Sequence, residues 1–408
     1  MKNLCLVTGL ICPLWLCYFL FQNIIDYNFG WKNLPTDLFE YSFEGKADDT
    51  YLIEIMTARA ELREIHRVSN APAVSIAVSI DGKTVWSEAL GLKDIQEKIP
   101  ADTSTQFRIG STSKALTSLA LGRLLEEKVI HLDSSIQFYT NHFQRKPKIS
   151  IRQLASHQSG IRNYSVCLCL PIWEYYRDKY FFTVEESLHD FEDDPLLFPP
   201  GDDFAYSTYN FTALSHAMEE AASTNFLALI KRQVLNPLAM RSTQPNLKHH
   251  KSSTQSEFYD IRNNEFRISS EVDLSNKWGG GGFMSTPSDL VKAGEALLSD
   301  SFLSKATIKL ITTPQTLSDG SENSQRYALG WRNQNSTKIL ENAEVQIIHH
   351  GGVAVGSQSL LVVLPEYKMV VSLLLNKSKT DSKFKLFDYL YPIAEIFIKE
   401  IELKQGLR

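Results

Sequence analysis

A serine and a lysine three positions apart, Ser111 and Lys114, form the pattern in this sequence with the clearest chemical potential. If Ser111 begins a helix, Lys114 lies one turn further along the same face, which brings an amine close to a hydroxyl. A serine hydroxyl is a weak nucleophile until a nearby base removes its proton. The start of a helix adds free backbone N–H groups and a partial positive charge. The spacing therefore predicts an acylating serine, although these residues alone also fit a helix-capping serine followed by a solvated lysine.

Tyr206 and two adjacent histidines are the other residues whose types could serve such chemistry. Tyr206 follows a Pro-Pro-Gly turn and precedes a helical pattern, so its side chain can reach back into a cleft. It becomes a base only if neighbouring cations lower its pKa from about 10; the alternative is a packing role. His349 and His350 precede two glycines at the start of a predicted strand, without further residues at metal-ligand spacing. We therefore predict no metal and no cofactor, and we interpret His157 as structural because it lacks a nucleophile-elbow frame.

Hydrophobic periodicity predicts the elements that must position these residues. After Ser111, apolar residues recur at helical spacing, and helical patterns broken by proline and glycine continue to about residue 300. The N-terminal part predicts a helix over 52–65 and a hairpin of strands 73–80 and 84–92, turned at Asp81-Gly82. The C-terminal part predicts strands over 345–348, 358–364 and 369–375, with a turn at 365–367, and a closing helix over 383–403.

Strands at both ends and helices in the middle predict an α+β fold. The most economical packing is one antiparallel sheet built from both chain ends, with a helical subdomain inserted between them. The polar stretch 246–265 is predicted to be a surface loop. Four consecutive glycines at 279–282 indicate a close backbone approach or unusual dihedral angles.

The composition and the N-terminal segment limit the classes of protein to which this chain can belong. The chain has 408 residues, 43% hydrophobic and 22% charged, with a net charge of −5, so a nucleic acid is not an expected partner. Residues 4–21 are apolar apart from one threonine, and no small-x-small cleavage site follows them. We therefore predict a membrane anchor over 1–22, a tether over 23–50 and a single folded domain over 51–408.

Taken together, these residues resemble the motifs of the penicillin-binding-protein and β-lactamase superfamily. Its three elements, S-x-x-K, Y-x-N and K-T-G, have counterparts here in the same order. The sequence more closely resembles the eukaryotic branch, the serine β-lactamase-like proteins of mitochondria. The resemblance covers 51–408 and rests on the segments 79–88, 154–162, 198–201, 206–208, 277–286, 327–331 and 352–356. It implies the β-lactamase/transpeptidase-like fold.

The resemblance implies a role for each matching residue. Ser111 would be the nucleophile that forms an acyl-ester, and Lys114 would accept its proton or position it as a cation. Tyr206 would be a second basic group that relays a proton to the leaving amine. Gly352 belongs to the strand element that walls the cleft, and the N–H groups of Ser111 and Val353 would form the oxyanion hole.

Two positions depart from the family pattern. Thr208 stands where the family has the Y-x-N asparagine, and a histidine replaces the K-T-G lysine. His350 fills that position without a gap, whereas His349 requires a shift of one residue. A histidine with an ordinary pKa of about 6.5 carries only partial charge at neutral pH. We therefore expect weak β-lactam turnover, and we expect His350→Lys to strengthen binding of carboxylate-bearing substrates.

These residues and the resemblance favour a membrane-tethered serine hydrolase that acts on a peptide or on a small amide or ester, with a peptidase preferred. The alternatives are an esterase or lipase of the same fold, and a catalytically weak, self-assembling scaffold that influences lipid metabolism. The resemblance implies a homo-oligomer in the mitochondrion, anchored in the membrane and facing the intermembrane space. The N-terminal segment fits a signal anchor of the secretory pathway equally well.

Overall fold

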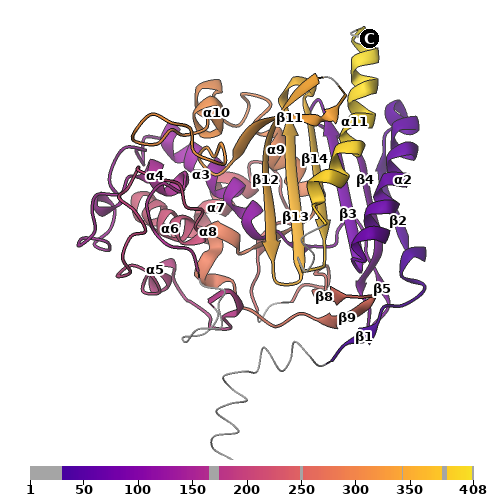
Figure 1. Ribbon diagram of the computed structural model, residues 1–408, viewed down its shortest axis with the longest axis horizontal. Helices are drawn as coiled ribbons and strands as arrows, with labels where there is room; N and C mark the ends of the chain where they lie inside the picture. The colour runs from indigo at the N-terminus through magenta and orange to yellow at the C-terminus, as the bar shows by residue number, and fades with distance from the viewer. Residues whose placement is uncertain (1–29, 165–173, 249–250, 342, 379–383, 407–408) are drawn as a thin grey trace, which may run out of the picture.

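The chain alternates between a strand-rich start, a helical middle and a strand-rich end (Figure 1). The computed structural model describes residues 30–164, 174–248, 251–341, 343–378 and 384–406. The helices are α2 (Leu52–Ser69), α3 (Ser113–Glu126), α4 (Ile151–Ala155), α5 (Val184–Leu188), α6 (Thr208–Ala222), α7 (Phe226–Ile230), α8 (Trp278–Gly281), α9 (Pro287–Glu295), α10 (Lys305–Thr312) and α11 (Leu386–Lys404). The strands are β1 (Lys32–Asn33), β2 (Ser42–Ala47), β3 (Ala73–Ile80), β4 (Lys83–Asp94), β5 (Ile99–Pro100), β6 (Phe107–Arg108), β7 (Gln244–Pro245), β8 (Tyr259–Arg262), β9 (Glu265–Ile268), β10 (Phe283–Ser285), β11 (Arg332–Leu340), β12 (Ala343–Ala354), β13 (Ser357–Leu364) and β14 (Met369–Leu375).

The main sheet is antiparallel and joins the two ends of the chain. Its strand order is β11-β12-β13-β14-β3-β4-β2, and β5 pairs with β4 at one end of that strand. The predicted hairpin between β3 and β4 is confirmed: Asp81 and Gly82 have φ angles of 49° and 76°, as a tight hairpin turn with two left-handed residues requires. The strands β3, β13 and β14 are buried along their whole length, which explains their nearly continuous apolar sequences.

Helices cover both faces of this sheet. The helices α2 and α11 pack together on one face, where they share a hydrophobic cluster with the strands (Figure 1). The helix α9 packs on the opposite face against β3, β13 and β14. The core on that side continues into the inserted helices, with α3 at its centre. The predicted α+β fold, with one sheet from both chain ends and a helical insertion, is confirmed.

Three stretches differ from the sequence-based expectation. The strand β2 lies within the predicted tether and pairs with β4, so the folded domain begins before residue 51. The predicted loop 246–265 contains β8 and the start of β9, whose turn at Asn263 and Asn264 has φ angles of 44° and 64°. Alternating burial of Tyr259 and Ile261 stabilises that hairpin. The strand β12 is longer than predicted and continues through both histidines and both glycines.

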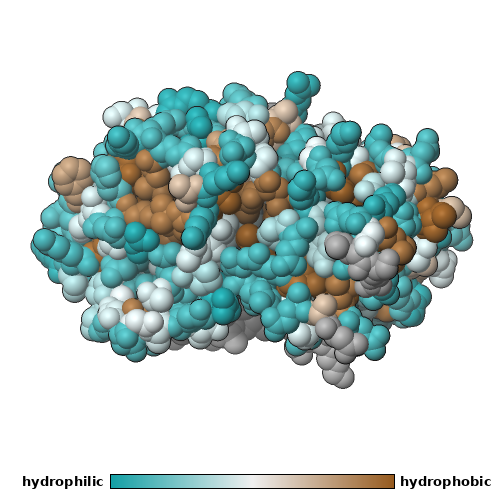
Figure 2. Space-filling view, turned by 90° about the horizontal axis from the view of Figure 1, so that it is seen from above, coloured by the Kyte–Doolittle hydropathy of each residue, from teal (hydrophilic) through white to brown (hydrophobic). Residues whose placement is uncertain are grey.

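The predicted anchor, residues 1–22, lies outside the described residues. Among the residues that the structure does describe, no helix is both long enough and apolar enough to cross a membrane. The surface seen in Figure 2 mixes hydrophilic residues with several hydrophobic patches. Some apolar side chains are strongly exposed, including Ile53 and Met56 on α2, at 76% and 63%.

Candidate active site

Ser111 lies in a single 3-10 turn, Gly110–Thr112, that leads directly into α3. This differs slightly from the prediction, in which Ser111 itself begins the α-helix. Gly110 has a φ of +48°, and a Cβ atom there would lie 2.6 Å from the carbonyl oxygen of Val353. Glycine is therefore required for the close approach between this turn and β12, and the turn holds Ser111 at the rim of the cleft.

Lys114 is fully buried, and it lies beside the serine hydroxyl as the spacing predicts. Its Nζ atom lies 3.3 Å from Ser111 Oγ and 3.4 Å from Thr208 Oγ1, and it donates a 2.6 Å hydrogen bond to the carbonyl of Gly280. Burial lowers the pKa of Lys114 well below its ordinary value, and two neighbouring cations lower it further. No carboxylate bonds to this amine within the described part of the chain. The amine is thus suited to accept the serine proton.

Tyr206 lies in the turn before α6, with its ring next to Lys114 Nζ at 4.9 Å from the ring centre. Burial raises the pKa of Tyr206, while a hydrogen bond with Ser111 and the charge of Arg332 act in the opposite direction. The ring of His157 packs at 4.3 Å from that of Tyr206, and its Nδ1 accepts a hydrogen bond from the Ser207 amide. His157 therefore supports the tyrosine, in agreement with its predicted structural role.

Thr208 begins α6 and contributes a buried hydroxyl next to the lysine. Its backbone N–H donates a 2.8 Å hydrogen bond to Asn163 Oδ1, which fixes the start of the helix. The glycines of α8 allow that helix to pack closely on α6: a Cβ atom on Gly280 would lie 2.6 Å from Thr208 Cγ2. The sequence predicts two alternative roles for the glycine run 279–282. The close backbone approach is observed, whereas unusual dihedral angles are not, since none of the four glycines has a positive φ.

A glycine-containing stretch of β12 forms one wall of the cleft. A Cβ atom on Gly352 would lie 1.9 Å from the carbonyl oxygen of Ile109, so a larger residue would push the strand away from the nucleophile turn. The next residue, Val353, is 40% exposed and lines the cleft together with Ser111. The backbone of Val353 runs beside Gly110, which places it next to the residue that precedes the nucleophile.

The two histidines of β12 lie on opposite faces of the sheet. His350 is on the side of Tyr206, whose ring lies 6.4 Å away, whereas His349 packs against Phe387 of the C-terminal helix. His350 Nε2 is 2.9 Å from the hydroxyl of Tyr327, and Nδ1 is 2.8 Å from the carbonyl oxygen of Gly351. Since only a protonated Nδ1 can donate to that carbonyl, Nε2 accepts from the tyrosine.

The expectation of a partly charged His350 is wrong. Burial and nearby cations lower the pKa of His350 well below its ordinary value, so the ring is neutral at physiological pH. The side chain is completely buried, and it is not among the residues that line the cleft at Ser111. A lysine at position 350 would therefore be buried beside other cations, and the expected gain in carboxylate binding from His350→Lys does not follow.

The cleft also contains residues that the sequence patterns did not single out as functional. It is lined by Gly110, Ser111, Tyr164, Tyr175, Thr208, Leu274, Lys277, Gly280, Gly281, Val353, Ala354 and Val355. Among them, Lys277 carries a charge but matches no catalytic motif. Outside that lining, the guanidinium of Arg332 lies 5.4 Å from the ring centre of Tyr206 and provides a permanent positive charge near the site. Only the fold brings Arg332, at the start of β11, to this position.

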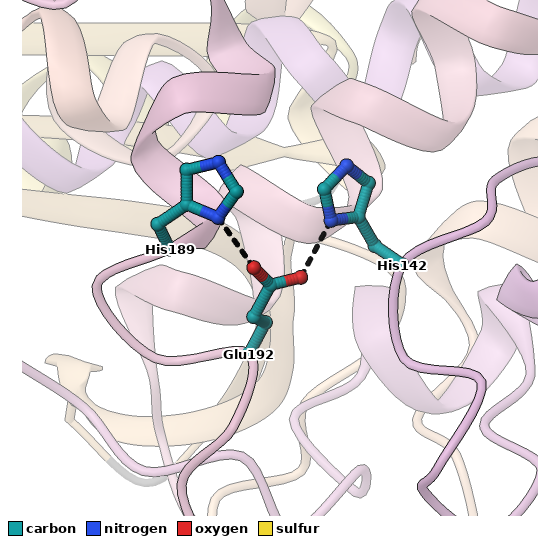
Figure 3. A group of neighbouring side chains, drawn as sticks. All are labelled: His142, His189 and Glu192. Carbon is teal, nitrogen blue, oxygen red and sulfur yellow. Dashed lines mark hydrogen bonds and ion pairs between the residues drawn. The ribbon is translucent and has the colours of Figure 1, made fainter.

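One group of side chains has the types and proximity of metal ligands, but it belongs to another part of the protein (Figure 3). His142, His189 and Glu192 have potential ligand atoms within 4.8 Å of one another. Each histidine directs Nδ1 to a different oxygen of the Glu192 carboxylate, at 2.5 Å in both cases. None of the three lines the cleft. These hydrogen bonds join the loop that carries His142 to the turn after α5.

Comparison with known proteins identifies the family of the domain that carries this cleft. The sequence profile of the family described as Beta-lactamase matches residues 59–392. The chain belongs to the beta-lactamase family. The match includes the nucleophile turn, the α6 turn and β12, so all the predicted site residues lie within the family domain.

Individual relatives give a more specific comparison for this beta-lactamase-family chain. It is 29% identical to the human serine beta-lactamase-like protein LACTB, mitochondrial, over 390 residues that cover 74% of this chain and 71% of the relative. It is 23% identical to penicillin-binding protein 4* of Bacillus subtilis over 313 residues, covering 73% of this chain and 66% of that protein. The predicted resemblance to the serine β-lactamase-like proteins is confirmed.

Solved structures support the fold assignment. An octameric penicillin-binding protein homologue from Pyrococcus abyssi matches with a TM-score of 0.67 and 21% identity, covering 86% of this chain and 77% of that chain. A D-amino acid amidase from Ochrobactrum anthropi matches with a TM-score of 0.69 and 18% identity, covering 86% and 99%. At these identities the likeness concerns the fold of the beta-lactamase-family domain.

Proposed function

We propose that this chain is a serine hydrolase that cleaves amide bonds of peptide substrates through an acyl-enzyme on Ser111. The observation that carries the proposal is the buried Lys114 amine, 3.3 Å from the Ser111 hydroxyl and without a carboxylate partner in the described chain. A structural lysine gains stability from an acidic partner, whereas a neutral amine beside a hydroxyl is the arrangement that activates a nucleophile.

The proposed reaction has two steps. Ser111 Oγ attacks the substrate carbonyl carbon while its proton passes to Lys114 Nζ, and the N–H groups of Ser111 and Val353 stabilise the resulting oxyanion. The C–N bond then breaks, and the leaving amine receives a proton through the hydroxyl of Tyr206. In the second step, a water molecule attacks the acyl-ester, Ser111 regains its proton, and the acid product leaves.

The free edge of β12 supports a peptide as the substrate. Pairing between β11 and β12 ends at Arg332 and His349, so in the described chain residues 351–354 have a strand partner only on the β13 side. Val353 lies on this stretch and lines the cleft. An extended peptide can pair with such an edge through its backbone, and this geometry presents its carbonyl carbon to a neighbouring nucleophile. An esterase would use the same catalytic groups, but backbone pairing with the edge of β12 would contribute less to the binding of an ester substrate.

The first experiment is covalent labelling of the full chain with a fluorophosphonate and, separately, with a penicillin, followed by intact-mass measurement. We expect one adduct that maps to Ser111, is absent in Ser111→Ala, and persists in the control Ser301→Ala at an exposed serine. We expect the penicillin adduct to form slowly, since the neutral His350 occupies the position of the family's charged lysine. A folded protein that forms no adduct with either probe would instead indicate a scaffold.

We further propose that the protein is membrane-anchored, self-assembling and mitochondrial. The apolar N-terminal sequence supports an anchor, and the exposed apolar residues Ile53 and Met56 on α2 offer a surface for a second copy. The human relative is named as mitochondrial, and the homologue from Pyrococcus abyssi is described as octameric. A role in lipid metabolism is proposed only through the resemblance to the eukaryotic branch.

A further inference from the structure

Lys277 is the only cationic side chain among the described residues that line the cleft at Ser111. It ends the 3-10 turn Ser275–Lys277, directly before α8, and it is 6% exposed. None of the other cleft-lining residues is acidic, so the cleft itself holds no counter-charge for this ammonium group. A buried cation is costly unless it is paired, and its presence at the nucleophile therefore requires an explanation.

Aromatic rings surround the Lys277 ammonium group where a carboxylate would be expected. Nζ lies 4.8 Å from the ring centre of Tyr164 and 5.2 Å from that of Tyr175. No hydrogen bond or ion pair joins Nζ to an acidic side chain within the described part of the chain. The carboxyl group of Asp273, whose charge raises the pKa of Lys277, is hydrogen-bonded through Oδ1 to Ser275. Cation–π contacts stabilise an ammonium group only in part, so its hydrogen-bonding capacity remains available.

We propose that Lys277 binds a carboxylate group of the substrate and positions it for acylation of Ser111. The inference rests on the proposed hydrolase function and specifies its substrate class. His350, which occupies the family's lysine position, is neutral and already engaged with Tyr327 and Gly351. Lys277 supplies the missing positive charge from a different element, in a cleft whose apolar walls strengthen the attraction.

The charges around Lys277 define the pH range in which it can act. Burial, together with the charges of Arg108 and Arg177, lowers the pKa of Lys277 to about 8, and Asp273 acts in the opposite direction. The two cleft tyrosines have raised pKa values and are neutral in this range. Lys277 is therefore protonated at neutral pH and loses its charge as the pH rises above about 8. Any preference for a carboxylate substrate should decrease over the same interval.

The test uses two pairs of short peptide thioesters. In the first pair, the residue next to the thioester carbonyl is Glu or Gln; in the second, the leaving group ends in a carboxylate or a carboxamide. We expect the wild-type chain to be acylated ~10-fold faster by the charged member of one pair, which also shows where the carboxylate lies. In Lys277→Met the ratio of the two acylation rates should fall below about twofold.

Controls separate this inference from the proposed function. The exposed-lysine variant Lys305→Met should keep the preference, and thermal unfolding should show that Lys277→Met is folded. Equal rates within both pairs, or a preference that persists in Lys277→Met, would overturn the carboxylate site while leaving the hydrolase intact. Absence of any Ser111 acylation would instead contradict the proposed function.

A binding measurement keeps the inference testable without catalysis. The variant Ser111→Ala lacks the nucleophile and cannot cleave amide analogues of the same pairs. Calorimetry with these analogues should give tighter binding for the charged member, by ~10-fold, and no difference when Lys277→Met is added. Equal affinities in Ser111→Ala would overturn the role of Lys277 whatever the labelling experiments show.

Discussion

Lys114 and Tyr206 share one cleft, and burial moves their pKa values in opposite directions. Burial disfavours the charged form of each group, so the amine loses a proton more readily and the phenol keeps its proton more firmly. The site therefore favours the neutral form of both groups that flank the Ser111 hydroxyl. We infer that the lysine serves as the base in acylation and that the tyrosine serves as the proton donor to the leaving group.

This division of roles predicts the pH dependence of acylation. Because the reactive form of Lys114 is the neutral amine, the rate of Ser111 labelling should rise by about tenfold per pH unit below its pKa and level off above it. Stopped-flow labelling between pH 5 and 9 measures this profile. Lys114→Met should lower the rate by about 10²–10⁴-fold. A rate that decreases as the pH rises through this interval would exclude the neutral lysine as base.

Local spacing explains which site residues could be predicted. Ser111 and Lys114 share a helix face, so the sequence alone was sufficient to pair them. The neutral state of His350 depends on burial against Tyr327, which is distant in sequence and could not be predicted from a reference pKa. Lys277 likewise follows no catalytic spacing, because its 3-10 turn is positioned by packing against α5 and α6.

At the scale of elements, the contact between β12 and the nucleophile turn depends on one of two adjacent glycines. A Cβ atom on Gly352 would lie 1.9 Å from Ile109 O, whereas one on Gly351 would meet nothing closer than 3.7 Å. Gly352→Ala should therefore lower the free energy of unfolding by about 1–3 kcal/mol and abolish labelling of Ser111. The matched control Gly351→Ala should retain labelling. Chemical denaturation and the fluorophosphonate assay measure both effects, and equal behaviour of the two variants would contradict this account.

The predictability of the elements follows from how each one is stabilised. Buried strands such as β14 have nearly continuous apolar sequences, which predict them directly. The turn of the β3–β4 hairpin is predicted by its residue types, Asp81 and Gly82. The strand β2 is mostly exposed and has no alternating pattern, because its pairing with β4 supplies most of its stability. Such an edge strand cannot be distinguished from a polar tether without the sheet.

At the scale of the whole molecule, four buried histidines link stability to pH. Burial lowers the pKa of His66 to about 4 and that of His349 to about 3, and it lowers those of His157 and His350 well below the ordinary value. Below pH 6.5 the unfolded chain therefore binds protons that the folded chain does not. The free energy of unfolding should fall with decreasing pH, by about 1.4 kcal/mol per pH unit for each such histidine.

His349 allows this linkage to be tested with a single substitution. Both its ring nitrogens are buried without a hydrogen-bond partner among the described residues. His349→Leu should raise stability at pH 5 relative to wild type and reduce the slope of stability against pH by about one proton. Urea denaturation between pH 5 and 7 measures the slope, with His131→Leu as the control at an exposed position. An unchanged slope would show that His349 does not contribute.

The pairing of β3 with β14 also sets an order of events during synthesis. The backbone N–H of Ala73 donates a hydrogen bond to Asn376 Oδ1, across a sequence separation of 303 residues. At a translation rate of about 5–20 residues per second, the completed β3–β4 hairpin waits for roughly 15 to 60 s before its partner strand emerges. Throughout that interval, β3 has no partner along one edge, although both of its faces are buried in the native protein. Newly made chains are therefore exposed to mispairing for that time, and they are natural clients for a chaperone until β14 closes the sheet.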